Sequence, residues 1–67
     1  MSREVLFEMT RLGNCIKVTA IDTETMVEVS IVGPVVASPV YLKRTALRKL
    51  QYVLAKRQAA RAVNKVV

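Results

Sequence analysis

The sequence has no histidine and no tryptophan, one cysteine, two glycines, two prolines and three aromatic residues. Without histidine, it lacks the commonest general base and the imidazole that activates most nucleophilic cysteines. One cysteine cannot close an intramolecular disulfide, and two glycines cannot build a glycine-rich phosphate loop. The carboxylates show no metal-ligand spacing. We therefore expect no enzyme activity, no metal, no cofactor and no small-molecule substrate.

Long apolar runs are also missing. The longest uncharged run, residues 29–42, is interrupted by Gly33, Pro34 and Pro39, and it is shorter than the roughly 20 residues that a membrane span needs. Charged residues are scattered through residues 1–20, where a secretory signal would need an apolar stretch. The sequence therefore predicts a cytoplasmic protein with no membrane span.

Hydrophobic residues make up 52% of the 67 residues, which is enough to form a core. The net charge of +6 is unevenly distributed. Residues 1–40 hold three basic and five acidic residues, whereas residues 41–67 hold eight basic residues and no acid, so that −2 and +8 sum to +6. This asymmetry suggests an anionic partner, such as nucleic acid, an acidic protein surface or a membrane face. The simpler interpretation is a solvated helix face.

Two stretches on either side of Gly13-Asn14 alternate in residue type with a period of two, as half-buried strands do. Gly13-Asn14 is a two-residue signal for a type II′ hairpin turn. A hairpin with this loop places Phe7 opposite Ala20 and gathers the apolar side chains on one face. We predict strands at about 4–12 and 15–22.

A third alternating stretch predicts a strand at about 26–32. Two registers with the preceding strand are open, and both keep the same inward residues because they differ by two positions. They pair Ala20 with Val27 across a loop at 22–25, or with Val29 across a loop at 23–26.

Gly33-Pro34 is expected to end the third strand, since proline cannot donate to the sheet ladder, and residues 33–38 are then a connector. Ser38-Pro39 indicates an N-cap followed by proline at the first helical position. No glycine or proline follows, so we predict one helix at about 39–62, with a fraying tail at 63–67.

This order predicts a single α+β domain over residues 1–67. Its architecture is a three-stranded antiparallel meander (β-β-β-α) with one long C-terminal helix packed on one face. The predicted core takes nine side chains from the strands and five from the helix: Val5, Phe7, Met9, Ile16, Val18, Ala20, Val27, Val29, Ile31, Ala46, Leu47, Leu50, Val53 and Leu54. So small a core rarely supplies more than about 3 to 5 kcal/mol, which favours a partner or self-association.

The predicted helix carries basic residues and one tyrosine on the side opposite its apolar stripe. Cations can contact phosphates, and an aromatic ring between them can stack on an exposed base. We therefore predict a polyanion-binding surface, with nucleic acid as one candidate ligand, formed by Arg44, Arg48, Lys49, Tyr52 and Lys56.

The alternative is a structural or adaptor module that self-associates or binds a protein through the outer face of the sheet and the end of the helix. In one of the two registers, Leu6, Ile21 and Met26 lie near one another on that outer face, and exposed apolar clusters often mark interfaces. Under either interpretation of the function, we expect a monomer or a weak homo-oligomer.

Four segments of the chain, namely REVLFE (3–8), VTAID (18–22), EVSIVGP (28–34) and RTALRKLQYVLAK (44–56), occur in this order. Together they resemble a family of small, uncharacterised alphaproteobacterial proteins of about 60 to 70 residues and unknown function. The similarity covers residues 3–57. It implies a small, free-standing cytoplasmic protein and carries over neither an activity nor binding residues.

Overall fold

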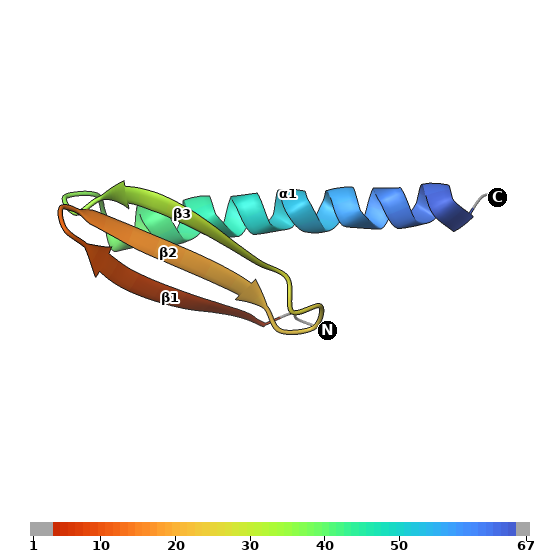
Figure 1. The fold of residues 1–67 in the computed structure, drawn as a ribbon, viewed down its shortest axis with the longest axis horizontal. Helices are drawn as coiled ribbons and strands as arrows, with labels where there is room; N and C mark the ends of the chain where they lie inside the picture. Colours follow the sequence, from red (N-terminus) through yellow and green to blue (C-terminus); the bar gives the residue numbers. More distant parts are fainter. Residues whose placement is uncertain (1–3, 66–67) are drawn as a thin grey trace.

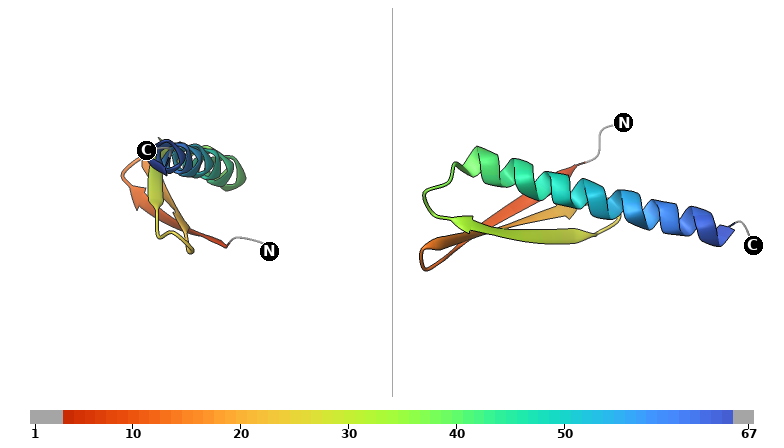
Figure 2. Two further views of the ribbon diagram at one scale, coloured as in Figure 1. Left: turned by 90° about the vertical axis from the view of Figure 1, so that its right-hand side faces the viewer. Right: turned by 90° about the horizontal axis from the view of Figure 1, so that it is seen from above.

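The computed structural model describes residues 4–65, with side chains to Ala59 (Figure 1). Strands β1 (Val5–Leu12), β2 (Cys15–Asp22) and β3 (Glu28–Pro34) form an antiparallel sheet in the order β1-β2-β3, and helix α1 (Pro39–Lys65) follows. The helix lies on one side of the sheet and extends beyond its end (Figures 1 and 2). The predicted α+β meander is confirmed.

The first hairpin has the predicted register, with Phe7 opposite Ala20. Gly13 has a φ of 62°, and the second loop residue, Asn14, has no positive φ. A positive φ at the first loop position alone is the signature of the predicted type II′ turn. The Nε of Arg11 donates a hydrogen bond of 2.9 Å to the carbonyl of Gly13, at the same turn.

The second hairpin adopts the register that pairs Ala20 with Val29. The buried carboxylate of Asp22 organises its loop: Oδ2 accepts hydrogen bonds from the backbone N–H and the hydroxyl of Thr25, at 3.2 and 2.7 Å. The amide of Met26 donates to the carbonyl of Asp22 at 2.8 Å. These bonds hold a four-residue turn at 23–26, so that the third strand begins at Glu28 and not at 26.

Met26 closes this turn with a φ of 61°, in the left-handed region, which residues other than glycine adopt only at a cost in free energy. Its side chain is 71% exposed and contributes little burial. We expect Met26→Gly to stabilise the fold by about 0.5 to 1 kcal/mol, because relief of backbone strain exceeds the entropy that glycine adds to the unfolded chain. Urea unfolding measures the difference. The matched control, Glu24→Gly in the same loop, should destabilise, and equal losses in both variants would contradict the strain argument.

Strand β3 continues through Gly33 to Pro34, two residues beyond its predicted end. Pro34 is tolerated because it is the last residue of an edge strand. Gly33 is buried beneath the helix, and a Cβ at this position would overlap Cδ2 of Leu42. The missing side chain therefore lets the start of α1 approach the sheet closely.

Ser38 caps α1 as predicted: its Oγ accepts a hydrogen bond of 3.4 Å from the amide of Tyr41, and its carbonyl accepts one of 3.0 Å from the amide of Leu42. The helix runs to Lys65, three residues beyond the predicted end, so part of the predicted tail is helical. Residues 66–67 of that tail lie outside the described residues. In the part of the chain that the structure describes, no helix is long and apolar enough to cross a membrane.

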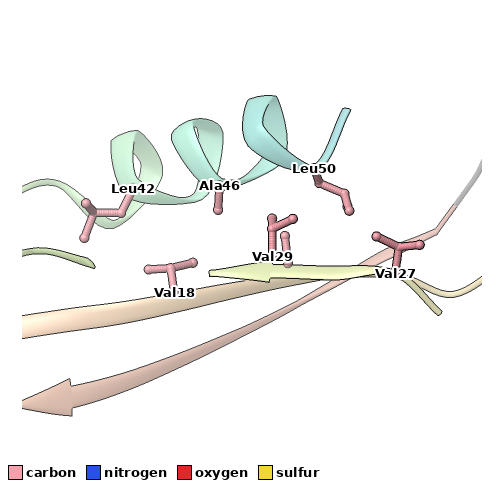
Figure 3. Packing of buried hydrophobic residues seen from close by; sticks show 7 residues of the cluster. Val18, Val27, Val29, Leu42, Ala46 and Leu50 are labelled. Carbon is pink, nitrogen blue, oxygen red and sulfur yellow. The ribbon is translucent and has the colours of Figure 1, made fainter. Parts of the chain in front are cut away.

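The core lies between one row of the helix and strands β2 and β3 (Figure 3). Leu42, Ala46 and Leu50 follow one another at a spacing of four residues and are at most 3% exposed. They point toward the buried valines of the sheet, among them Val18 and Val29 (Figure 3). Leu42 is absent from the predicted core, whose helical part begins at Ala46.

The predicted core is wrong at Met9, which is 41% exposed. The physical reason is the position of α1, which packs against β2 and β3 and makes few contacts with β1. Alternation along β1 correctly indicates which side chains face the helical layer. It does not indicate that the helix stops short of covering them.

Candidate polyanion-binding site

Arg44, Arg48 and Tyr52 lie on the face of α1 that is turned away from the sheet. Successive helical residues are separated by about 100°, which places these three roughly opposite the buried row of Leu42 and Leu50. All three side chains are exposed, and Tyr52 is 63% exposed. The structure therefore presents two guanidinium groups and a phenol ring to solvent on one face.

Lys56 lies one turn after Tyr52, and its Nζ is 5.4 Å from the centroid of the tyrosine ring. A cation at this distance is attracted by the negative face of the ring. The contact gathers a positive charge and an aromatic surface into one exposed unit. Two of the predicted site residues, Tyr52 and Lys56, are therefore in contact.

Lys49 lies elsewhere than predicted. Its Nζ donates a hydrogen bond of 2.8 Å to the carbonyl of Ser30 on strand β3. At about 100° per residue, position 49 falls beside the buried row and not opposite it, so the side chain reaches the edge of the sheet. The hydrogen bond thus holds the Lys49 ammonium at the edge of the sheet, although position 49 lies within about 20° of position 56 around the helix axis.

Tyr41 is a candidate residue that the sequence reasoning missed. It is 61% exposed and precedes Tyr52 by 11 residues, which is about three helical turns and about 16 Å along the axis. The two tyrosines therefore lie along the same face of α1, and this spacing was the available signal. We call the resulting surface the tyrosine-basic face; it consists of Tyr41, Arg44, Arg48, Tyr52 and Lys56.

Acidic residues lie away from the tyrosine-basic face. All five belong to residues 1–40, and none belongs to the helix. Glu8 and Glu28 alternate with the inward residues of β1 and β3, so their exposed side chains lie on the sheet face opposite α1. The charged residues of the helix are therefore all basic, whereas the sheet carries both signs, with Lys17 on the same outer face as these two carboxylates, and this difference orients the helix toward an approaching polyanion.

The interface predicted on the outer sheet face is not assembled as a three-residue cluster by cross-strand pairing. Leu6 lies opposite Ile21, as the first hairpin requires. Met26 would lie opposite Ile21 only in the register that the chain does not adopt; Glu28 occupies that position, and Met26 lies in the turn. The side chains at the end of the helix, from residue 60 onward, lie outside those described.

A comparison with protein families matches residues 2–57 to a domain of unknown function, DUF6898. No curated protein and no solved structure matches the chain. The matched range covers all three strands and the helix through Arg57, so it includes the complete tyrosine-basic face.

Proposed function

We propose a polyanion-binding role for this chain, which belongs to the DUF6898 family of domains of unknown function. Its ligand is nucleic acid, bound without catalysis by the tyrosine-basic face of α1. We assign it to the cytoplasm, in keeping with its single cysteine. We also propose an alphaproteobacterial origin, which the resemblance noted above supports.

The exposed pair of Tyr52 and Lys56 carries this proposal. A lysine beside an aromatic ring can neutralise a phosphate while the ring stacks on the adjoining base. Arg44 and Arg48 continue the row of cations along the helix, and the helix has no acid to repel a phosphate. Ring and cations together favour single strands, because a stacked base must first be free of its duplex partner.

A salt-dependent NMR titration tests the proposal directly. The ¹⁵N-labelled chain is titrated with a single-stranded oligonucleotide of mixed sequence at about 50 and 200 mM salt, the range in which phosphate contacts lose most affinity. Three phosphate contacts, by Arg44, Arg48 and Lys56, predict a salt slope of about −2 and therefore a loss of about 16-fold. Amide shifts should concentrate between Tyr41 and Lys56. An absence of shifts at 50 mM, or shifts confined to the sheet, would overturn the proposal.

Replacement of Tyr52 separates stacking from charge. We expect Tyr52→Ala to weaken binding of a single strand by about 5- to 150-fold, since stacking on one base contributes about 1 to 3 kcal/mol. The matched control, Tyr52→Phe, keeps the ring and should bind within about twofold of the natural chain, because the hydroxyl is not needed for stacking. Fluorescence anisotropy of a labelled oligonucleotide measures both. Equal losses in the two variants would show that the ring does not stack.

A further inference from the structure

An open apolar groove runs between β1 and α1. It has a volume of about 360 Å³ and is lined by Val5 and Phe7 of β1, and by Leu47, Leu50, Gln51 and Leu54 of the helix. The groove exists because α1 packs over β2 and β3 and makes few contacts with β1. We call it the β1 groove.

The two edge strands of the sheet, β1 and β3, differ in how well they are protected against pairing with a further strand. At the β3 edge, Lys49 donates to the carbonyl of Ser30, and Pro34 ends the strand. Lysine and proline are the residues with which proteins block unwanted strand pairing. Strand β1 has eight residues and contains neither; Lys43 of α1 reaches over it, but its Nζ lies 5.9 Å from the centroid of the Phe7 ring, which leaves the backbone edge uncapped by that contact. It is therefore the edge that is open to another strand.

The backbone of β1 is oriented for such pairing. The two-residue hairpin makes Leu12 and Cys15 a hydrogen-bonded pair, so the even-numbered residues of β1 turn their N–H and C=O groups toward β2. The odd-numbered residues, from Val5 to Arg11, turn theirs toward the free edge. Leu6 and Leu12 on the outer face and Met9 on the inner face flank this edge and are 55%, 52% and 41% exposed, so apolar surface borders it on both sides.

We propose that a second copy of this chain binds at this edge. The two β1 strands pair antiparallel about a two-fold axis, form a six-stranded sheet, and cover part of each β1 groove. A second copy fits because it offers both a free strand of the same length and an apolar groove of the same composition, as an isologous interface requires. The proposal goes beyond polyanion binding, since the tyrosine-basic face lies on the opposite side of α1 and stays free.

The side chains that would face each other across the two β1 strands favour one register of pairing. Pairing between odd-numbered residues places a single residue of β1 on the two-fold axis. Glu8 on the axis would oppose two carboxylates, and Phe7 on the axis would set Leu6 against Glu8. Met9 on the axis sets Leu6 against the exposed Leu12 of the second copy and leaves Glu8 opposite a threonine. We therefore assign the axis to Met9.

The required area and the charge distribution are both compatible with a dimer. A stable interface covers about 800 Å² per partner, which is about 15% of the 5263 Å² that this chain exposes. Residues 1–40, which contain the whole sheet, carry a net charge of −2, and the excess of positive charge lies in residues 41–67. Pairing at β1 therefore joins the two copies through their less basic parts, with the exposed Lys43 of each helix near the interface, over Phe7.

The oligomeric state of the full chain tests the proposal. We expect sedimentation equilibrium to give twice the 7.5 kDa chain mass. Met9→Lys should raise the dissociation constant at least about 100-fold by placing two like charges at the axis. The matched control is Val32→Lys, at a 62% exposed position on β3, and it should remain a dimer. A natural chain that is monomeric at about 1 mM would overturn the proposal, as would equal dissociation of both variants.

Cysteine cross-linking tests the register independently of any folding defect in Met9→Lys. In a Cys15→Ser background, Met9→Cys should oxidise to a covalent dimer faster than Glu8→Cys, because only position 9 meets its own copy on the axis. Faster cross-linking of Glu8→Cys would overturn the register. Faster cross-linking of Val32→Cys than of either would place the interface at β3 and overturn the proposal as a whole.

Discussion

Leu50→Ala is expected to leave most of the chain unfolded at 25 °C. Leu50 is fully buried and is the largest side chain in that state. Truncation of a buried leucine to alanine costs about 2.7 to 5 kcal/mol. A domain of this size has about 3 to 5 kcal/mol of net stability from its core, so one substitution removes most or all of it.

The loss at Leu50 should lie in the middle of that range. The fully buried residues facing it are short, whereas the partly exposed Phe7, Leu47 and Leu54, which line the β1 groove with it, can partly fill the cavity. Ala46 precedes it by one turn, and the facing core residues of the sheet are valines and an alanine (Figure 3). Circular dichroism and urea unfolding measure the loss. Val40→Ala, at a 64% exposed position on the same helix, should stay within about 0.5 kcal/mol. A loss below about 1 kcal/mol for Leu50→Ala would show that the core does not depend on this residue.

Protein concentration must be varied in these unfolding experiments. A dimer that forms only from folded chains raises the apparent stability by mass action, so the transition of the natural chain should move upward with concentration. The same dependence should be absent in Met9→Lys. Stability and self-association are thus measured by one set of curves.

Local patterns were sufficient to predict the first hairpin. The turn signal at Gly13-Asn14 lies between two alternating stretches, and together they determine the turn type, the register and the inward face. All of this information is contained in about 18 consecutive residues, because side-chain alternation and turn geometry are local properties. The helix start at Ser38-Pro39 was predictable for the same reason.

The register of the second hairpin was not predictable, because a shift of two residues leaves the alternation of inward and outward side chains unchanged. The choice rests on the buried carboxylate of Asp22, which accepts two hydrogen bonds from Thr25, and on the left-handed backbone of Met26. The pattern identified Asp22 as a turn residue. It did not show that Asp22 would be fully buried and would accept hydrogen bonds from the loop residue Thr25.

Periodicity along α1 predicted which face is buried, but it did not predict the lateral position of the helix over the sheet. That position depends on Gly33, whose missing side chain admits Leu42, and on the coverage of β2 and β3 at the expense of β1. Both the exposure of Met9 and the β1 groove follow from it. It also brings Lys49 within reach of the carbonyl of Ser30 at the sheet edge. Tyr41, by contrast, could have been found from its spacing of 11 residues to Tyr52.

The proposed dimer and the proposed binding face reinforce each other. Both helices would cover the same side of a six-stranded sheet, so both tyrosine-basic faces would point away from it in the same general direction. A long strand engaged by both faces would bind more tightly than one engaged by a single face, because the second contact is intramolecular. A short oligonucleotide that spans one face would gain nothing. The affinities of the long and the short oligonucleotide should therefore differ in the natural chain and be similar in Met9→Lys. This comparison measures how far dimer formation strengthens binding.

The double charge reversal Arg44→Glu/Arg48→Glu is expected to abolish measurable binding at 50 mM salt. It changes the net charge from +6 to +2 and replaces two phosphate contacts with repulsion at the centre of the tyrosine-basic face. Each charged contact contributes on the order of 1.5 to 3 kcal/mol, so the affinity should fall at least about 100-fold. Fluorescence anisotropy with a single-stranded oligonucleotide measures it. The matched controls are the single variants Arg48→Glu and Lys17→Glu, both of net charge +4; Lys17 is exposed on β2, so only the first should lose most of its affinity.

This loss can be separated from unfolding because the double variant should be at least as stable as the natural chain. Both arginines are exposed, and glutamate has nearly the same helix propensity as arginine. The first turn of α1 contains no acid, so glutamate at position 44, close to that turn, also interacts favourably with the helix dipole. Intact unfolding curves with lost binding would therefore locate the ligand on this face. If Arg48→Glu and Lys17→Glu lost the same affinity for the oligonucleotide, the attraction would depend on net charge alone. That result would overturn the assignment of the binding site to this face.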